Sequence, residues 1–434
     1  MRRLTSLAFV LLLALATATG CRGASVPSSG PIYLGVVLPQ TGGLAADGAA
    51  WVRAVRLAAD EVNAAGGVLG GRRIELLVAD SATASTAGVS GAQTVLGNGA
   101  VAIIGDGGSD GSLAIYQMVT QMRRVVQVSG SATSISLTTE NAMLPASDRY
   151  FFRTAPPDGY QAQVVDHIAM DLNPGMTPTR SCHHLGILYQ DDAYGRPLAQ
   201  SIATLFAMHG TVAAMVSFMP DQAGYDDRLT MFDGVAPDCV ALITYPRDAG
   251  TILRNWTDHR PVLPTVQWIG TDGLFSADFL AEAASASLIA GFLGASPLTT
   301  PNTPEFMDFA ARYTTAYGHA PENFTASYYD ATALVLLAIE RAGSTDGAMI
   351  RDSLRAIGGS GGAQVEHAGG LLEALTELQA ASPRTINYQG ASGPITFDAN
   401  GDTVAPYEIW SVSGTPAAFS QVAVVQAMDL MTTP

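Results

Sequence analysis

The chain has 434 residues, of which 48% are hydrophobic and only 14% are charged. All 22 of its basic residues are Arg, and these stand against 38 acidic residues, so the formal net charge is −16. Because such a surface repels phosphate backbones, no nucleic-acid partner is expected. The positive mean hydropathy of +0.22 excludes a disordered chain, and the length predicts two or three domains.

The N-terminal segment predicts export. Arg2 and Arg3 precede an apolar stretch, Leu4 to Ala16, that is too short to span a bilayer. A positive start followed by a short apolar stretch and small residues is typical of a secretory signal peptide. We therefore assign residues 1–20 to a signal peptide that the mature protein lacks.

Two cleavage sites fit the end of this segment. Residues 18–21, Ala-Thr-Gly-Cys, resemble a lipobox, in which Cys21 becomes a lipidated N-terminus. Residues 16–18, Ala-Thr-Ala, fit ordinary cleavage and a soluble mature form. We favour the lipoprotein, because residues 21–31 are rich in Ser, Gly and Pro and predict a flexible tether.

Two further cysteines predict a disulfide. Cys182 and Cys239 remain as a pair in an oxidising compartment, and each begins an apolar run. If these runs are parallel neighbours in one sheet, both sulfurs lie at the same edge. A zinc site built on Cys182-His183-His184 is the weaker alternative, because adjacent strand residues point to opposite faces and cannot easily share an ion.

From residue 32 onward, short β-rich runs alternate with helical patterns, which is typical of parallel sheets flanked by helices. In the first half the predicted strands are Ile32–Leu38, Ile74–Ala79, Val101–Ile104 and Val125–Val128, and the predicted helices are Ala45–Ala64, Thr86–Leu96 and Ser112–Met122. In the second half the predicted strands are Leu185–Tyr189, Val212–Phe218, Val240–Tyr245 and Val266–Ile269, and the predicted helices are Pro197–His209, Tyr225–Phe232 and Ala249–Trp256.

Two similar α/β units, followed by the helices Pro304–Tyr317, Ala326–Arg341 and Ala348–Ile357, predict two doubly wound parallel-sheet lobes. Tyr150–Thr154 and Gly291–Ala295 are predicted to cross between them. We expect lobe 1 to comprise residues 32–154 plus 297–394, and lobe 2 residues 155–296 plus 395–434. Ligands of open α/β sheets bind at the carboxyl ends of the strands, so a cleft between the lobes is expected there.

The region before the C-terminus contains two further patterns. Gly-rich residues 358–370 and a helix, Leu371–Ala381, are interpreted as a surface insertion. Residues 395–402 are predicted to form a hairpin around Asn400-Gly401. Their Asp-x-Asn-x-Asp spacing resembles the start of a calcium loop, but Ile409 stands where the final Glu belongs, so no metal is expected.

One motif points to an enzyme. Gly107-Gly108-Ser109-Asp110-Gly111 is a G-x-S-x-G sequence between a predicted strand and a helix, the context of a hydrolase nucleophile. Asp272 with His319 or His367 would complete a triad, yet no oxyanion-hole segment precedes Ser109. The same stretch nearly matches a dinucleotide fingerprint, but Asp110 replaces the third glycine, so no cofactor is expected.

A binding site explains these residues better. Ser109 begins a helix, where free N–H groups favour an anion, and Thr133 lies in a second hydroxyl-rich loop at the same sheet edge. In the second half, Tyr194, Tyr245 and Asp272 follow equivalent strands. One lobe thus presents anion-binding groups and the other a carboxylate, which favours a zwitterionic ligand.

Several stretches resemble the leucine/isoleucine/valine-binding family of periplasmic proteins, which supply ABC importers. They are residues 32–42 (IYLGVVLPQTG), residues 58–70 (AADEVNAAGGVLG), Val101–Gly105, residues 149–154 (RYFFRT), residues 192–195 (DAYG) and Ile395–Asp402. The resemblance extends from about Ile32 to Asp402. It implies two lobes that are joined by three hinge strands and close on a small molecule without transforming it.

The resemblance also implies roles for single residues. Ser109, the Ser131 backbone and Thr133 would hold the ligand carboxylate, and Asp272 would meet the α-ammonium group. Tyr194, Tyr245 and Phe324 would surround the ligand side chain.

Three departures from the family pattern leave the ligand open. Asp272 is one methylene shorter than the usual Glu, Ala46-Asp47 replaces an aromatic residue, and Ser81–Ser85 replaces an Asp-Pro element.

We therefore expect a monomeric solute-binding protein of the periplasm or cell envelope, anchored to the membrane only through Cys21. It would present an amino acid or similar small molecule to an ABC permease in the inner membrane. A ligand-sensing receptor module is one alternative, and a serine hydrolase that uses Ser109 is another.

Overall fold

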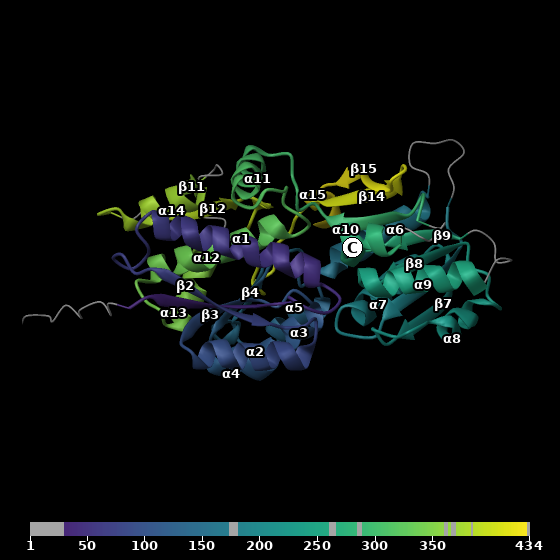
Figure 1. Ribbon diagram of the computed structural model, residues 1–434, viewed down its shortest axis with the longest axis horizontal. Helices are drawn as coiled ribbons and strands as arrows, with labels where there is room; N and C mark the ends of the chain where they lie inside the picture. Colours follow the sequence, from purple (N-terminus) through teal and green to yellow (C-terminus); the bar gives the residue numbers. More distant parts are fainter. Residues whose placement is uncertain are drawn as a thin grey trace, which may run out of the picture.

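The computed structural model describes residues 30–172, 181–259, 266–283, 289–359, 363–365, 370–382 and 385–431. The predicted signal peptide, Cys21 and most of the tether lie outside these residues. The described chain forms two α/β lobes that lie side by side along the long axis of the molecule (Figure 1). None of its helices combines the length and the apolar character needed to cross a membrane.

Lobe 1 is built on a five-stranded parallel sheet with the order β2-β1-β3-β4-β5. Its strands are β1 (Ile32–Leu38), β2 (Ile74–Asp80), β3 (Ala100–Gly105), β4 (Val126–Ser129) and β5 (Phe151–Arg153). Strand β1 is buried almost throughout, as expected of a continuous apolar run that is covered by helices on both faces.

The helices of lobe 1 come from two separate parts of the chain. They are α1 (Ala45–Ala64), α2 (Ser85–Gly97), α3 (Ser109–Ile115), α4 (Gln121–Arg123), α5 (Ile135–Met143), α11 (Pro304–Tyr317), α12 (Thr325–Ala342), α13 (Gly347–Ile357) and α14 (Gly370–Gln379). Helix α12 is apolar on nearly every side and buried from Thr325 to Ile339, so it forms the centre of the lobe 1 core.

Lobe 2 is built on a seven-stranded sheet with the order β15-β14-β10-β9-β8-β6-β7. Its strands are β6 (His184–Gln190), β7 (Thr211–Phe218), β8 (Cys239–Ile243), β9 (Gln267–Gly270), β10 (Leu293–Pro297), β14 (Tyr407–Ser413) and β15 (Ala418–Val425). Strands β6 to β10 pair in parallel, whereas β14 and β15 add an antiparallel edge. Its helices are α6 (Asp158–Met170), α7 (Gly195–Phe206), α8 (Asp226–Leu229), α9 (Pro246–His259), α10 (Ala277–Glu282) and α15 (Ala427–Met431).

The described chain passes between the lobes at three places: after β5, after β10 and before β14. Ile395 and Phe397 pack in the core of lobe 1. The expected boundary at residue 395 is therefore too early, because the chain leaves lobe 1 only after Phe397.

Two sequence predictions near this point are wrong. Residues 395–402 form no hairpin: the carboxylate of Asp398 accepts the N–H groups of Asn400 (2.7 Å) and Asp402 (3.0 Å), and this turn has no paired strands on either side. Helix α14 is not a surface insertion, because Leu371 and Leu375 are buried in the lobe 1 core. The three-stranded β11-β12-β13 sheet beside it comprises Ala363–Val365, Ile386–Gly390 and Gly393–Pro394.

Candidate ligand-binding site

A cavity with about 390 Å³ of empty space, including its opening, lies between the lobes at the carboxyl ends of the strands. All seven residues predicted to bind a ligand line it, and both lobes contribute. They are Ser109, Ser131, Thr133 and Phe324 of lobe 1, and Tyr194, Tyr245 and Asp272 of lobe 2. The arrangement follows from the fold, because Ser109 follows β3, Thr133 follows β4, and the three lobe 2 residues follow β6, β8 and β9.

The lobe 1 wall is rich in hydroxyl groups. Ser109 starts α3, and its Oγ accepts the N–H of Ser134 at 3.2 Å. Ser131 is more engaged than predicted: its Oγ donates to the Gly107 carbonyl at 2.8 Å, and its N–H donates to Ser129 at 3.3 Å. Ser109 and Thr133 are therefore the stronger candidates for holding an anion, and Ser131 supports the loop.

A buried arginine positions the loop that carries Thr133. Arg153, at the end of β5, donates from Nη1 to the carbonyl of Ala132 (3.1 Å) and to that of Ser134 (2.9 Å). Its Nε donates to Oδ1 of Asp402 at 2.6 Å. Asp402, the last acid of the Asp-x-Asn-x-Asp sequence, is the buried partner of Arg153.

The lobe 2 wall centres on Asp272. The hydroxyl of Tyr194 donates to Oδ1 of Asp272 at 2.7 Å and also contacts Oγ1 of Thr271 at 2.8 Å. The rings of Tyr194 and Tyr245 stack with their centroids 5.6 Å apart. Burial raises the pKa of Asp272, and the hydrogen bond from Tyr194 opposes that rise. A cationic ligand group beside Asp272 would stabilise the ionised carboxylate in place of the hydration that burial removes.

A second acid, Asp158 at the start of α6, lies close to Asp272. Its carboxylate is buried, and the side chain of Thr133 is the neutral polar group that acts on it. Burial raises its pKa well above the usual value, and the negative charge of Asp272 raises it further. Two buried carboxyl groups therefore lie next to one another here, and burial together with their mutual repulsion opposes the ionisation of both at once.

Sequence reasoning missed eight residues that line the cavity. They are Leu44, Asp47, Trp51, Gly107, Gly273, Phe275, Ser276 and Asn323. Asp47 and Trp51 stand four residues apart on α1 and so share one face of that helix. Trp51 is held in place because its Nε1 donates to the carbonyl of Asn323 at 2.9 Å. Two signals were available: this i, i+4 spacing, and the departure from the family pattern at Ala46-Asp47. The spacing by itself does not place α1 beside the cavity.

The hydrolase alternative needs a histidine base near Ser109, and the described residues provide none. No histidine is among the described residues that line the cavity. The ring of His319 lies against the Ala320 carbonyl (3.0 Å) and Glu322 (3.8 Å). His367, the other candidate, lies outside the described residues. Ser109 therefore has no histidine here to remove its proton.

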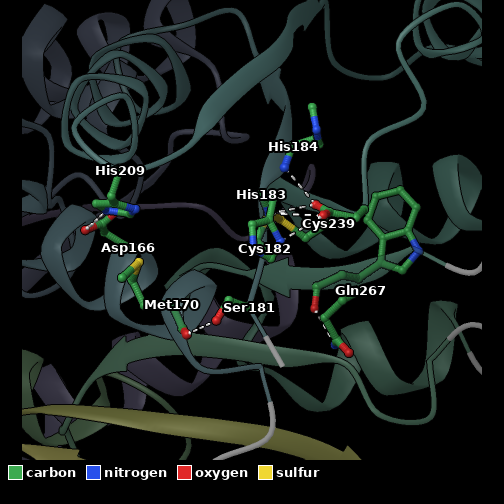
Figure 2. The surroundings of a disulfide bond; sticks show 11 residues. Asp166, Met170, Ser181, Cys182, His183, His184, His209, Cys239 and Gln267 are labelled. Carbon is green, nitrogen blue, oxygen red and sulfur yellow. Dashed lines mark hydrogen bonds and ion pairs between the residues drawn. A yellow bond between two sulfur atoms is a disulfide. The ribbon is translucent and has the colours of Figure 1, made fainter. Parts of the chain in front are cut away.

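Cys182 and Cys239 are joined by a disulfide with their Cα atoms 5.8 Å apart (Figure 2). Strands β6 and β8 pair in parallel, so the two cysteines meet at the amino end of the lobe 2 sheet. The cavity lies at the carboxyl end. Both sulfurs are used by the disulfide, so neither is a free thiolate for the zinc site considered above, although the Asp238 carboxylate is close to both.

A family described as the receptor family ligand binding region matches residues 50–415. The chain belongs to this family. The Leu/Ile/Val-binding protein BraC3 of Rhizobium johnstonii is 27% identical over 319 residues, which cover 73% of this chain and 81% of that protein. The chemotactic signal transduction system substrate-binding protein BasB of Halobacterium salinarum is 26% identical over 384 residues, covering 87% and 86%.

Solved structures of similar proteins share the fold. The leucine-binding protein LivK of Thermotoga maritima has a TM-score of 0.74 at 22% identity and covers 92% of this chain and 99% of its own. LivJ of Streptococcus pneumoniae, solved with isoleucine, has a TM-score of 0.70 at 22% identity, with coverages of 91% and 99%. The predicted two-lobed α/β fold and the predicted leucine/isoleucine/valine-binding family are confirmed.

Proposed function

We propose that this chain is an exported solute-binding protein that captures an amino acid or a related small molecule between its lobes and delivers it to an ABC importer. The observation that supports this most is the convergence of Ser109 and Thr133 from one lobe and Asp272 from the other on one cavity. The names of relatives that bind leucine, isoleucine and valine point to the same class of ligand.

In this proposal the two lobes bind opposite ends of the ligand. Ser109 and Thr133 hold the carboxylate through hydroxyl and N–H groups, and Asp272 binds the α-ammonium group in a charge-assisted hydrogen bond. Tyr194, Tyr245 and Phe324 enclose the side chain. A ligand on lobe 1 gains the contacts of lobe 2 only when the lobes are closed, so binding shifts the molecule toward the closed state.

Delivery requires the protein to stay near its permease. We propose that Cys21 carries a lipid that keeps the monomer at the membrane of the cell envelope, and that the closed, loaded form docks on an ABC permease of the inner membrane. Incorporation of labelled palmitate into the wild-type chain, and its loss in the Cys21→Ser variant, tests the anchor. Equal labelling of both would overturn it.

The binding role is tested by native mass spectrometry of freshly purified protein and by a thermal-shift panel of amino acids and amides. A bound ligand raises the melting temperature with the logarithm of its excess over Kd. Asp272→Asn is expected to weaken zwitterionic ligands about tenfold or more, since it removes one partner of a buried charge pair, and to spare ligands without an ammonium group. Asp227→Asn, which changes an exposed lobe 2 acid, is the matched control.

A sensing role is the second candidate, because one relative is named a chemotactic signal transduction substrate-binding protein. Both roles use the same ligand capture and differ in the partner of the closed form. Crosslinking of the loaded protein in cell membranes separates them. Capture of a permease supports the importer, and capture of a transducer supports the sensor.

A further inference from the structure

A second carboxylate lines the ligand cavity from lobe 1. Asp47 stands in the first turn of α1 and is one of the residues that line the cavity. The residue is 8% exposed, so little of it is in contact with solvent. Burying an ionisable carboxylate without a partner costs free energy of folding. The position of Asp47 therefore calls for an explanation.

No described residue provides a partner for Asp47. An acid in the first turn of a helix usually caps the free N–H groups there, but the N–H of Leu44 donates to Oγ1 of Thr83 at 3.1 Å, and α1 has no side-chain cap at its N-terminus. The charged groups that act most on Asp47 are Asp278 of α10 and Glu322, and both are acidic. Its carboxylate is thus left free to face the cavity.

The balance of charge in the cavity points to the missing partner. Asp47 and Asp272 are both among the lining residues, and these include no Arg, Lys or His in the described part of the chain. A ligand with one ammonium and one carboxylate group pairs with Asp272 and with the Ser109 and Thr133 wall. Such a ligand leaves Asp47 without a partner, whereas a second cationic group would provide one.

We propose that the ligand is an amino acid whose side chain ends in a cationic group, ammonium or guanidinium, and that Asp47 binds this group. The inference rests on the function proposed above and specifies its substrate class. Leu44, Trp51 and Phe324 line the same cavity, so apolar surface is available for the methylene stem of such a side chain. Asp272 keeps its role at the α-ammonium group.

The protonation of Asp47 agrees with this role. Burial raises the pKa of Asp47 to about 7, and the negative charges of Asp278 and Glu322 contribute to that rise. The empty site therefore holds a proton for part of the time at neutral pH. A cation that binds there displaces the proton, so binding is expected to release protons to the buffer.

The test compares ligands with and without a distal cationic group. Isothermal titration of the wild-type protein at pH 7.5 with L-arginine and with L-citrulline, its uncharged isostere, isolates that charge. L-lysine and L-norleucine form a second pair. Arginine or lysine is expected to bind about tenfold or more tightly than its neutral counterpart, with proton release that appears as a buffer-dependent enthalpy.

Two variants of α1 then assign the effect. Asp47→Asn is expected to abolish the preference for the cationic member of each pair and to leave the neutral member within about twofold of wild type. Asp60→Asn makes the same charge change at an exposed position of the same helix and is expected to keep the preference. Circular dichroism confirms that each variant is folded.

The outcomes separate this inference from the proposed function. Binding of leucine or citrulline with equal or higher affinity than arginine and lysine would overturn the cationic ligand and leave amino-acid capture standing. The absence of binding by any amino acid would overturn both. A cationic preference that survives in Asp47→Asn would remove Asp47 from the site.

Discussion

The hydroxyl of Tyr194 donates a 2.7 Å hydrogen bond to Oδ1 of Asp272, so two residues that both line the ligand cavity also fix one another. The same hydroxyl lies 2.8 Å from Oγ1 of Thr271, which leaves it little freedom to turn away. Tyr194 thus fixes the orientation of the Asp272 carboxylate, which is the group proposed to bind the ligand ammonium.

We predict that Tyr194→Phe weakens ligands with an α-ammonium group by about 1.5 kcal/mol, or about tenfold in Kd, because a hydrogen bond to a charged group is lost. The stacked ring remains, so the cavity keeps its shape. Isothermal titration measures the change. Tyr33→Phe, in β1 and outside the cavity lining, is the control, and an unchanged Kd for Tyr194→Phe would show that Tyr194 does not orient Asp272.

Two adjacent glycines are predicted to differ sharply. A Cβ at Gly107 would lie 2.4 Å from the Trp51 ring and 3.0 Å from Pro39, so Gly107→Ala must displace a cavity wall. A Cβ at Gly108 would meet only Tyr245 and Leu44, at 3.5 and 3.9 Å. Gly107→Ala is expected to lower ligand affinity and the free energy of unfolding by about 1–3 kcal/mol, and Gly108→Ala to be tolerated. Equal losses of affinity and stability in both variants would show that the close approach of Gly107 to the Trp51 ring is not what limits this position.

Reduction of the Cys182–Cys239 disulfide is predicted to lower stability and to spare ligand binding. The bond closes a sequence separation of 57 residues, which corresponds to about 4 kcal/mol in the chain-entropy model. It also lies at the sheet end away from the cavity. Dithiothreitol should lower the melting temperature of the wild type and not that of the Cys182→Ser/Cys239→Ser variant. A large rise in Kd on reduction would show that the two ends of the lobe are coupled.

The ligand-free protein is predicted to become less stable as pH rises from 5 to 8. Burial raises the pKa values of Asp47 and Asp106 to about 7 from the usual 3.8, so the folded chain keeps protons that the unfolded chain has already released. Over this range stability is then highest at pH 5, falls up to about pH 7 and levels off above it, because the two states differ in bound protons only between the two pKa values.

Differential scanning calorimetry at pH 5, 6, 7 and 8 measures this slope, with an expected fall in melting temperature of about 2 °C or more. Asp106→Asn cannot titrate and should flatten the profile. A melting temperature that rises across the same range would show that these two buried acids do not govern the pH dependence.

Much of the fold was predictable because hydrophobic periodicity carries it. Strand β1, helix α1 and helix α11 have the predicted bounds, since each combines a clear apolar pattern with clear ends. The helix predicted at Ser112–Met122 instead runs from Ser109 to Arg123 as α3, a π-helical turn and α4. Strands β14 and β15 were not predicted. For β15 the reason is that the strand is largely exposed and lacks a continuous apolar run.

The site was predictable where its residues follow strands and not where they depend on packing. Ser109, Thr133 and Asp272 come directly after strands whose carboxyl ends meet at one edge. Asp47 and Asp158 each stand in the first turn of a helix, where an acid is ordinary, so the sequence does not indicate that tertiary packing buries them. The amphipathic pattern of α14 likewise does not show that other parts of lobe 1 cover its apolar face.

Arg153 stands where the chain first leaves lobe 1, and its partner Asp402 stands in the last of the three connections. The same guanidinium binds the carbonyl oxygens on either side of Thr133. The Arg153 side chain therefore links two of the connections between the lobes to the loop proposed to bind the ligand carboxylate. A rotation at either connection is therefore expected to move the Thr133 loop, and a carboxylate bound at Thr133 is expected to restrain that rotation.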